Sequence, residues 1–335
     1  MNSKSKIYFI ENSFNYNGSD LNSEKIGGSE KTLINISNEL AKDKSFIVRV
    51  FNNSLKPLAL NDVHWNNINT IDKSDKPDFV IAMSDANLFK KLNCNKNYLW
   101  SHSIQTIEKF IRKNQLLSFF KYKPIMILEG EYHYNNRHYL TSIYGKKILK
   151  IASDYDFINT NINIKNIPPP NAIFTTKSDR NLDFLIDSWK QIKKTNIDSN
   201  LYINPPYNLT DGDQKNGIKL RIKGDKKSLI NDLINSRLFI TPGHKTEVFC
   251  LAAEEAKELC IPIVTMGKGC LYERVEHGIT GFIAKNQTQF INYSKEVLNN
   301  TKLYLDLRKN LINIKGSRNY SHVKKDLIKI LNEND

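Results

Sequence analysis

The fold of this chain is decided by residues 238–264, LFITPGHKTEVFCLAAEEAKELCIPIV. The apolar run at 238–240 predicts a buried parallel strand, which the Pro-Gly pair at 242–243 ends. A helix is expected to open near Glu247 and to run to Leu259, and the apolar residues 261–264 begin the next strand. This succession of strand, loop, helix and strand indicates an α/β domain with a parallel sheet.

Two carboxylates in this unit have the spacing of a binding site. Glu247 lies at the loop-to-helix junction and Glu255 two helical turns further in, so both can face one cleft. An ionised carboxylate only accepts hydrogen bonds, which suits the vicinal hydroxyls of a sugar or a ribose. The first-turn N–H groups of Phe249, Cys250 and Leu251 suit phosphate oxygens. The alternative is a surface helix whose first acidic residue complements the helix dipole.

This stretch resembles the signature helix of the family 4 glycosyltransferases of the GT-B fold, which is written E-G-F-G-L-x-x-x-E-A. Glu247 stands where the first glutamate belongs, and the positions that match are Phe249, Leu251, Glu255 and Ala256. Val248 and Cys250 stand where the family has glycine. The resemblance implies that Glu247 holds hydroxyls of a donor sugar, that Glu255 holds the ribose, and that Phe249, Cys250 and Leu251 lie in the donor site.

The resemblance continues over residues 261–282, which follow the family pattern P-V-V-x-T-x-x-G-x-x-E-x-V-x-x-G-x-x-G-F in order. Gly267 and Gly269 lie in a loop after a strand, where open parallel sheets place their ligands. The most specific part of the resemblance therefore runs from about Pro242 to Phe282.

A basic loop precedes the helix expected at 181–189. Arg180 aligns with a lysine that grips the donor diphosphate in the family. The arginine that the family has five positions earlier is Thr175 here, and we expect Lys177 to replace it. The alternative for Lys177 is a solvated loop charge.

The first half of the chain has an α/β pattern of its own. A strand is expected at 6–10, a helix from Gly27-Gly28-Ser29-Glu30 to about Ala41, and a strand at 46–51. A glycine pair at a helix start lets backbone N–H groups approach an anion, and the alternative is a flexible loop with a Ser29 cap. Residues 27–31 resemble the family's G-G-A-E-R loop, which implies that Gly27 and Gly28 face the donor diphosphate.

One histidine stands at a favoured place for a functional side chain. Strands are expected at 78–83 and 97–100, and His102 follows the second of them, at the carboxyl end of a parallel strand. A lone histidine is more often structural. The family commonly has a histidine here, which implies that His102 positions the acceptor and relays a proton. His64, His133 and His244 are weaker candidates.

The domain boundary is expected at three consecutive prolines, 168–170, which cannot lie inside a helix or a central strand. We expect an acceptor-side Rossmann-like domain at 1–166, a donor-binding Rossmann-like domain at 167–319, and a helix within 320–335 that returns to the first domain. The length of 335 residues fits two α/β domains. The resemblance implies the GT-B fold, with two doubly wound domains across a cleft.

Composition excludes several classes of protein. No run of about 18 apolar residues and no secretory leader is present, so we expect a cytoplasmic protein. The four cysteines form no C-x-x-C pair, which argues against a zinc site or a disulfide framework. Asp211-Gly212-Asp213 has the D-x-D pattern of metal sites in the GT-A fold, but it lies late in the chain in a Pro/Asn/Gly loop, so we expect no metal and no cofactor.

The net charge of +14 is unevenly distributed. Residues 1–85 hold 10 basic and 11 acidic residues, whereas residues 86–128 hold 8 and 1. Within the second segment, Lys109–Lys123 interleaves cations with apolar groups at the spacing of an amphipathic helix. Such a helix could lie on an anionic membrane, placing the protein peripherally on the cytoplasmic face, or it could bind single-stranded nucleic acid, which we do not favour. The ordinary alternative is a helix packed on the core with a solvated basic face.

These observations predict a retaining, metal-independent glycosyltransferase. We expect it to move a hexose-type sugar from a nucleoside diphosphate donor to a hydroxyl group of a lipid or glycan. Two alternatives stay open: a sugar-nucleotide epimerase of the same fold, and a catalytically degenerate protein that binds nucleotide sugars or polyanions.

Overall fold

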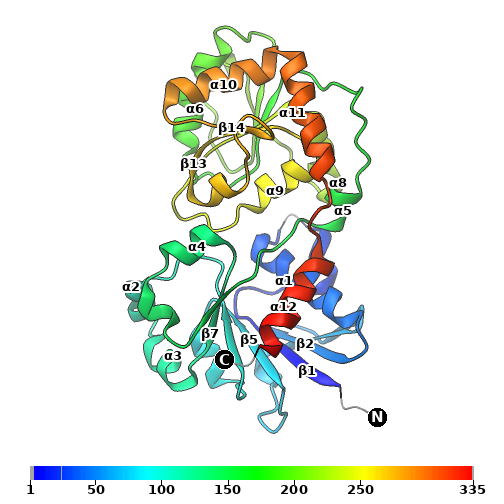
Figure 1. Cartoon of the computed structure of the whole chain (residues 1–335), viewed down its shortest axis with the longest axis vertical. Coiled ribbons are helices and arrows are strands. Elements are labelled where there is room, and N and C mark those ends of the chain that lie inside the picture. Colours follow the sequence, from blue (N-terminus) through cyan, green and yellow to red (C-terminus); the bar gives the residue numbers. More distant parts are fainter. Residues whose placement is uncertain (1–3, 24, 334–335) are drawn as a thin grey trace. The chain divides into compact units, whose positions relative to one another are not determined.

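The computed structural model describes residues 4–23 and 25–333. The chain forms two compact units. The first comprises the chain up to Ile151 together with the residues from Tyr320 onward, and the second comprises Ala152–Asn319. Each unit is an α/β domain built on one sheet (Figure 1).

The first unit is built on an eight-stranded sheet in the order β3-β4-β2-β1-β5-β6-β7-β8. All neighbouring strands are parallel except β3 and β4. The strands are β1 (Ser5–Ile10), β2 (Phe46–Asn52), β3 (Leu58–Leu60), β4 (Val63–Asn67), β5 (Phe79–Met83), β6 (Asn97–Trp100), β7 (Ile125–Leu128) and β8 (Lys146–Ile148). The α-helices are α1 (Gly28–Ala41), α2 (Ile107–Arg112), α3 (Leu116–Tyr122), α4 (Glu131–Asn136) and α12 (Tyr320–Asn332). Short 3-10 turns occur at Gly18–Asn22, Ile68–Thr70, Ala86–Lys90 and Tyr139–Ser142.

The central strands of this sheet are covered on both faces. All five side chains of β5 and all four of β6 are buried, as their nearly continuous apolar sequences require. The neighbouring strand β1 buries its last four residues. The core around these strands includes the fully buried aromatic side chains of Phe89, Phe110 and Phe119.

The last helix, α12, packs on α1 within the first unit. Its apolar residues recur at helical spacing, so that Val323, Leu327 and Ile330 are buried on one face. The Tyr98 hydroxyl also donates a hydrogen bond to the Ile330 carbonyl at 3.3 Å. The first unit is therefore assembled from two segments that are far apart in the sequence.

The second unit has a six-stranded parallel sheet in the order β11-β10-β9-β12-β13-β14. Its strands are β9 (Ala172–Phe174), β10 (Leu201–Ile203), β11 (Ile218–Leu220), β12 (Leu238–Gly243), β13 (Ile263–Lys268) and β14 (Gly281–Ile283). Its helices are α5 (Tyr155–Asn159), α6 (Leu182–Lys193), α7 (Asp211–Lys215), α8 (Lys226–Ile234), α9 (Leu251–Glu258), α10 (Gln287–Asn299) and α11 (Thr301–Ile314), with a 3-10 turn at Gly269–Glu273. Its core includes the fully buried Trp189, whose indole N–H donates to the Asn216 carbonyl at 3.0 Å.

The two units divide between Ile151 and Ala152, before the three prolines at which the sequence places the boundary. The reason lies in Lys226, which is buried and contacts Asp154 and Asp156 at 2.6 and 2.9 Å. Phe157 packs into the apolar core of the same unit. These contacts attach α5 to the second unit although it precedes the prolines.

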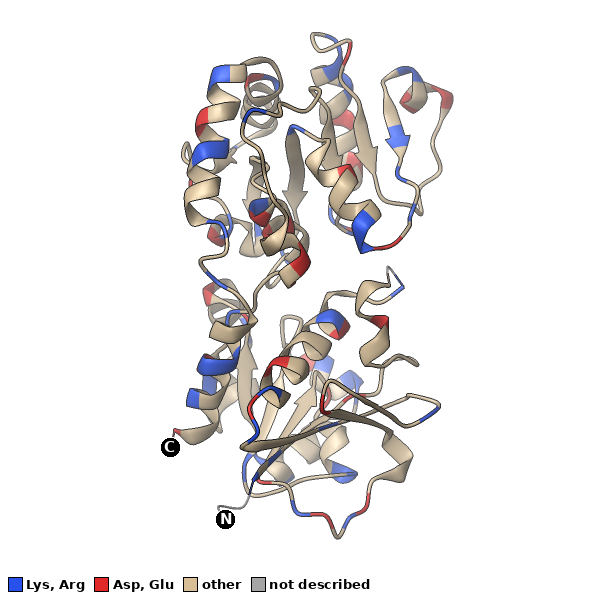
Figure 2. Cartoon of the chain, turned by 90° about the vertical axis from the view of Figure 1, so that its right-hand side faces the viewer, with Lys and Arg blue, Asp and Glu red and all other residues tan. Residues whose placement is uncertain are grey.

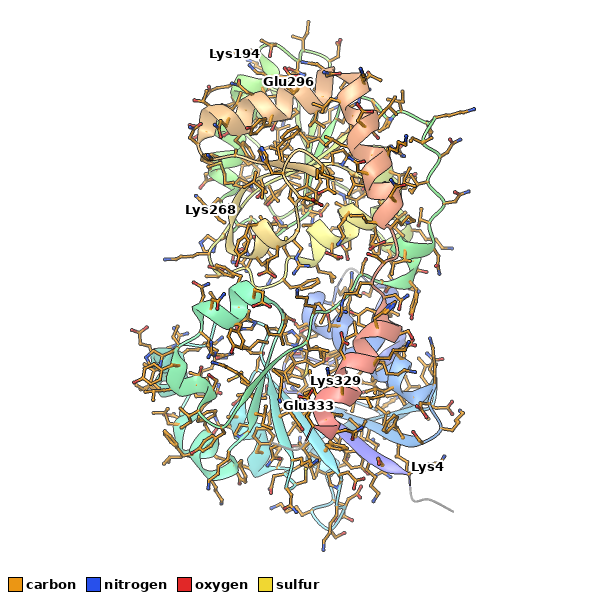
Figure 3. The ribbon with its side chains drawn as sticks, viewed as in Figure 1. Lys4, Lys194, Lys268, Glu296, Lys329 and Glu333 are labelled. Atoms are coloured by element: carbon orange, nitrogen blue, oxygen red, sulfur yellow. The ribbon has the colours of Figure 1, made fainter. Side chains whose placement is uncertain are left out.

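Charged residues of both signs are distributed over both units (Figure 2). Lys194, Lys268 and Glu296 are exposed on the second unit, and Lys329 is exposed on α12 (Figure 3). Among the described helices, none is both long enough and apolar enough to cross a membrane.

Candidate functional site

The candidate site in the second unit lies at the point where the strand order reverses. Strands β9 and β12 are neighbours, but the chain proceeds from β9 to β10 on one side and from β12 to β13 on the other. Loops that leave such neighbouring strands diverge and open a crevice at their carboxyl ends. Arg180 follows β9, and Glu247 follows β12.

These two loops are joined by the Arg180 guanidinium. Its Nη1 donates a hydrogen bond to the Thr246 hydroxyl and lies 3.4 Å from Nδ1 of His244. Its Nε lies 3.9 Å from a carboxylate oxygen of Glu247 and 3.5 Å from one of Asp179. The Arg180 guanidinium is therefore held beside Glu247 by a hydrogen bond to the Thr246 hydroxyl. Its two contacts with carboxylates, at 3.5 and 3.9 Å, are longer.

Glu247 is a buried carboxylate, with 8% of its surface exposed. Its Oε2 accepts the backbone N–H of His244 at 3.2 Å. Burial raises the pKa of Glu247, and the Arg180 cation opposes this effect. A carboxylate in this position is oriented before any ligand arrives.

The loop that carries Glu247 packs against the turn that contains Gly269 and Cys270. The Glu247 carbonyl accepts the N–H of Cys270 at 3.1 Å. Gly269 has a φ of +68°, and a Cβ there would lie 2.3 Å from the His244 carbonyl oxygen and 2.9 Å from that of Glu247. Only glycine permits this close approach. The glycine that the family pattern has at position 269 is thus needed for the close contact between this turn and the loop that carries Glu247.

The helix expected from Glu247 begins later, at Leu251. The cause is Cys250, which adopts a left-handed conformation with φ +58° and ψ +72° and so interrupts the helical backbone. Glycine is the residue best suited to this conformation, and the family has glycine here. Val248 and Phe249 therefore lie in the loop, and the expectation that Phe249 and Cys250 contribute first-turn N–H groups is wrong.

The remaining predicted residues of this site have different environments. Phe249 is 3% exposed and packs under Arg274, whose guanidinium carbon lies 4.0 Å from the ring centroid. Leu251 is half-buried at the first position of α9, and Glu255 is 7% exposed in its second turn. Lys177 is exposed. The structure thus joins Arg180 to Glu247 directly, but it does not show Lys177 in that cluster.

The Asp211-Gly212-Asp213 triplet has a structural role. Asp213 completes a capping box with Thr210 at the start of α7, and its carboxylate lies 3.4 Å from the Lys190 ammonium. Within the described residues, no group of three or more His, Cys, Asp or Glu side chains has the geometry to hold a metal ion.

A second candidate site lies in the first unit, also where the strand order reverses, between β1 and β5. Gly27 precedes α1, and Gly28 is its first residue. The Glu30 carboxylate folds back toward this start: it accepts the Ser29 hydroxyl at 3.0 Å and would lie 2.8 Å from a Cβ at Gly27. A negative group of the chain itself therefore already stands at this helix start.

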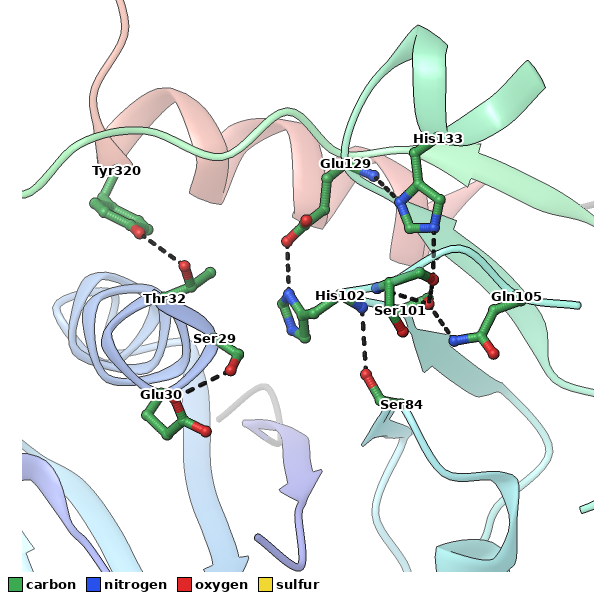
Figure 4. A network of polar contacts seen from close by, with 11 residues as sticks. Ser29, Glu30, Thr32, Ser84, Ser101, His102, Gln105, Glu129, His133 and Tyr320 are labelled. Carbon is green, nitrogen blue, oxygen red and sulfur yellow. Dashed lines mark hydrogen bonds and ion pairs between the residues drawn. The ribbon is translucent and has the colours of Figure 1, made fainter. Parts of the chain in front are cut away.

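His102 lies on the same side of this sheet and is held by a carboxylate (Figure 4). Its Nδ1 donates to Oε1 of Glu129 at 2.5 Å, and its backbone N–H donates to the Ser84 hydroxyl at 3.2 Å. Its Nε2 has no hydrogen-bond partner among the described residues. A proton held on Nδ1 by Glu129 leaves Nε2 as a hydrogen-bond acceptor. This arrangement suits a group that receives a proton.

His133, by contrast, is a structural residue. It is fully buried; Nδ1 accepts the Glu129 N–H at 3.2 Å, and Nε2 donates to the Ser103 carbonyl at 3.0 Å. Burial lowers the pKa of His133 to about 4. Both ring nitrogens of His133 are therefore engaged within the chain, whereas His244 contacts Arg180. His64 lies in β4.

The low pKa of His133 predicts a pH-dependent stability. The unfolded chain binds this proton at a higher pH than the folded chain, so stability falls as the pH drops from about 6.5 toward 4, by about 3 kcal/mol in total. In His133→Asn this contribution should be absent. Thermal unfolding at pH 7 and pH 5 should therefore show a smaller acid-induced decrease in Tm for His133→Asn than for the unsubstituted protein. An equal decrease would contradict the assignment.

Several residues of these sites were not found from the sequence. Thr246, whose hydroxyl accepts a hydrogen bond from Arg180, belongs to none of the motifs, and only its position beside Glu247 could have indicated a role. Glu129 follows β7, a strand that the sequence analysis did not identify, although the apolar run at 125–128 indicates one. Glu11 and Tyr16, which line a pocket of the first unit together with His102, follow β1 in a segment that reads only as a polar loop.

The two doubly wound sheets are those of the GT-B fold. Residues 175–314 match the family Glycosyl transferases group 1, so the second unit carries a glycosyltransferase domain of this family. A comparison with curated proteins finds no match.

Solved structures share this fold at low sequence identity. Sucrose-phosphate synthase from Thermosynechococcus elongatus has a TM-score of 0.71 and 11% identity, with 98% of each chain covered. HepE from Anabaena, in complex with UDP-glucose, has a TM-score of 0.70 and 16% identity over 97% of this chain and 99% of that one. TarM from S. aureus has a TM-score of 0.60 and 14% identity over 76% of this chain, which spans 55% of the TarM chain.

Proposed function

We propose that this protein transfers a hexose-type sugar, with retention of anomeric configuration, from a nucleoside diphosphate to a hydroxyl group of a lipid or glycan. The observation that carries the proposal is the placement of Arg180 beside the buried Glu247 carboxylate at the switch point of the second sheet. A cation there suits a diphosphate, and a pre-oriented acceptor suits sugar hydroxyls. The fold shared with HepE, which was solved with UDP-glucose, supports a hexose donor.

The proposed chemistry breaks the bond between the anomeric carbon and the diphosphate oxygen. Negative charge accumulates on the leaving diphosphate, and a fixed cation such as Arg180 stabilises it more than it stabilises the ground state. The N–H groups at the start of α9 add a smaller contribution. With this charge balanced by the protein, the proposed reaction requires no divalent metal.

The acceptor hydroxyl forms the new bond to the anomeric carbon and loses its proton. We assign to His102 the positioning of this hydroxyl, with its unpartnered Nε2 as a place for the proton. Gly27 and Gly28 remain candidates for contact with the diphosphate. The negative Glu30 carboxylate at that helix start favours Arg180 as the main contact.

Two other functions would give distinct results. A sugar-nucleotide epimerase would convert the donor without any acceptor. A degenerate binding protein would hold the nucleotide sugar without turnover. The conformation of Cys250 argues against degeneration, because the residue adopts a left-handed backbone, the conformation that the family's glycine takes most readily.

Nucleotide binding gives the first test of the donor site. One of UDP, GDP and ADP, alone or as sugar conjugates, should raise the Tm of the protein, since a ligand that binds only the folded state stabilises it. Glu255→Ala should abolish most of this rise if Glu255 holds the ribose. Thermal-shift measurements on both proteins test this prediction and identify the base. The absence of a response to every nucleotide would contradict the proposed donor site.

We also propose that the acceptor is presented at an anionic membrane surface. The segment Lys109–Lys123 forms two short helices, α2 and α3, because Asn114 has a φ of +52° between them. Three of its apolar side chains are exposed: Ile111 (56%), Leu117 (83%) and Phe120 (47%). Lys109 is an exception among its cations, since it donates to the Ser103 hydroxyl and burial lowers its pKa to about 8.

The membrane proposal has a direct test. The protein should sediment with phosphatidylglycerol-containing vesicles and much less with neutral phosphatidylcholine vesicles. The double variant Leu117→Ser, Phe120→Ser should lose most of this binding, whereas Leu55→Ser, at an exposed residue outside the segment, should retain it. Equal sedimentation of both variants, or no sedimentation of the unsubstituted protein, would contradict the proposal.

A further inference from the structure

The first unit contains a cavity of about 510 Å³ at the carboxyl ends of β1, β5 and β6. This volume lies within the range of roughly 300–1,000 Å³ that is typical of small-molecule pockets. Glu11 enters it from the end of β1, Asp85 from the end of β5, and His102 from the end of β6. Glu30 contributes from the start of α1, on the same side of the sheet as His102 (Figure 4).

The charge of this cavity is opposite to that of the whole chain. Three carboxylates line it, from Glu11, Glu30 and Asp85, against one ammonium, from Lys113. The chain itself carries a net charge of +14. Glu11 is 8% exposed, and burial together with the neighbouring Glu30 raises its pKa. The cavity therefore concentrates negative charge and hydrogen-bond acceptors.

The polar atoms of the cavity wall are incompletely satisfied. Oε2 of Glu11 and the hydroxyl of Tyr16, a residue only 2% exposed, have no hydrogen bond within 3.5 Å to a described residue, although the two groups interact: burial and the neighbouring Glu11 raise the pKa of Tyr16. Nε2 of His102 also has no hydrogen-bond partner among the described residues. Buried polar atoms without partners are rare in folded proteins because each costs about 1–3 kcal/mol. The carboxylates and the imidazole that line this cavity are hydrogen-bond acceptors, so they suit a ligand that supplies hydrogen-bond donors.

We propose that this cavity binds the acceptor and that the part of the acceptor which enters it is an uncharged sugar residue. The inference rests on the proposed function, since it assigns the chemical class of the acceptor. Several hydroxyls on one ring donate to Glu11, Glu30 and Asp85, and one of them lies within reach of His102. Carboxylates accept such hydrogen bonds strongly because the acceptor is charged.

The same carboxylates exclude an anionic residue. A uronate or a phosphorylated sugar would place a negative charge among three others in a partly buried cavity, where screening by salt is weak. Juxtaposition of like charges in such a site is a main source of discrimination between ligands. The acceptor site should therefore reject sugars that differ from the accepted one only by a negative charge.

Two synthetic glycosides test this inference on the full chain. Octyl β-glucoside and octyl β-glucuronide, below their micellar concentrations, differ only at the carbon that carries the carboxylate. Saturation-transfer NMR should give a Kd for the glucoside that is lower by roughly tenfold or more. Glu11→Gln should weaken glucoside binding and strengthen glucuronide binding, so that the ratio of the two values approaches one.

The ratio separates this role from a structural one. A variant that merely loosened the cavity would weaken both glycosides equally and leave their ratio unchanged. Lys113→Gln should move the ratio the other way, against the glucuronide. Asp62→Asn is the matched control: it removes an exposed carboxylate from the same unit, at a residue with a φ of +62° that asparagine tolerates, and it should not change the ratio.

Three results would overturn the inference: equal or tighter binding of the glucuronide by the unsubstituted protein, an unchanged ratio in Glu11→Gln, or binding of neither glycoside. None of these results depends on turnover or on the donor site in the second unit. Failure of the proposed transferase function would appear separately, as the absence of a nucleotide response or of sugar transfer.

Discussion

Glu247→Gln should lower sugar transfer by about 10²- to 10³-fold while the protein stays folded. The Glu247 carboxylate is buried, oriented by the His244 N–H, and placed beside Arg180. Glutamine keeps the shape and can still accept one hydrogen bond, but it removes the charge that polarises the hydroxyls of the donor sugar. The loss should appear mainly in kcat, because these hydrogen bonds strengthen as charge develops on the sugar ring.

The measurement is transfer of labelled sugar to acceptor, together with nucleotide binding and Tm. Glu296→Gln is the matched control, since Glu296 is an exposed glutamate on α10 of the same unit (Figure 3). Glu247→Gln should bind the free nucleotide diphosphate with little change, because the nucleotide lacks the sugar hydroxyls. An active Glu247→Gln enzyme with unchanged kcat would overturn the assignment of Glu247.

Arg180→Ala should also lower transfer by about 10²- to 10³-fold, but with a different pattern. The Arg180 guanidinium, in the loop after β9, lies 3.9 Å from the Glu247 carboxylate and donates a hydrogen bond to the Thr246 hydroxyl. Its removal should weaken binding of the nucleotide diphosphate as well as slow its departure. Arg180→Lys keeps the charge but loses the planar array of donors, so its activity should lie between the two.

Arg180→Ala has a second expected effect, on the pH profile. Arg180 holds the pKa of Glu247 below the value that burial alone would produce. Without the cation, Glu247 takes up its proton at a higher pH, so the acidic limb of activity should shift toward higher pH. Lys177→Ala, at an exposed position, provides the comparison. Loss of activity in Lys177→Ala as large as in Arg180→Ala, or an unshifted acidic limb in Arg180→Ala, would contradict this account.

The sequence predicted most of the fold because the fold depends on buried strands. The two parallel sheets and the GT-B fold are confirmed, and the apolar runs at 79–83, 97–100 and 238–240 lie in central strands. Short edge strands such as β3 and β8 span only three residues and have no fully buried residue, so periodicity did not reveal them. The boundary between the units depends on the contacts of Lys226 with two aspartates, and no local pattern reports such contacts.

The residues of the candidate sites were likewise predicted only in part. Glu247, Glu255 and Arg180 were found because the spacing of a motif carries them, and their roles remain predictions. The start of α9 was misplaced because a left-handed Cys250 is invisible to helix propensity. The link between His102 and Glu129 joins the ends of two neighbouring strands, β6 and β7. It follows from the sheet order, which the sequence alone does not specify.

The packing of α12 on α1 has a consequence for biosynthesis. A ribosome makes α1 early and α12 only after all of residues 152–319 have been synthesised. The nascent first unit therefore exposes the surface of α1 on which α12 later packs, while the second unit can already fold as an uninterrupted segment. The second unit should thus fold during translation, and completion of the first unit should be the last event before the enzyme can act.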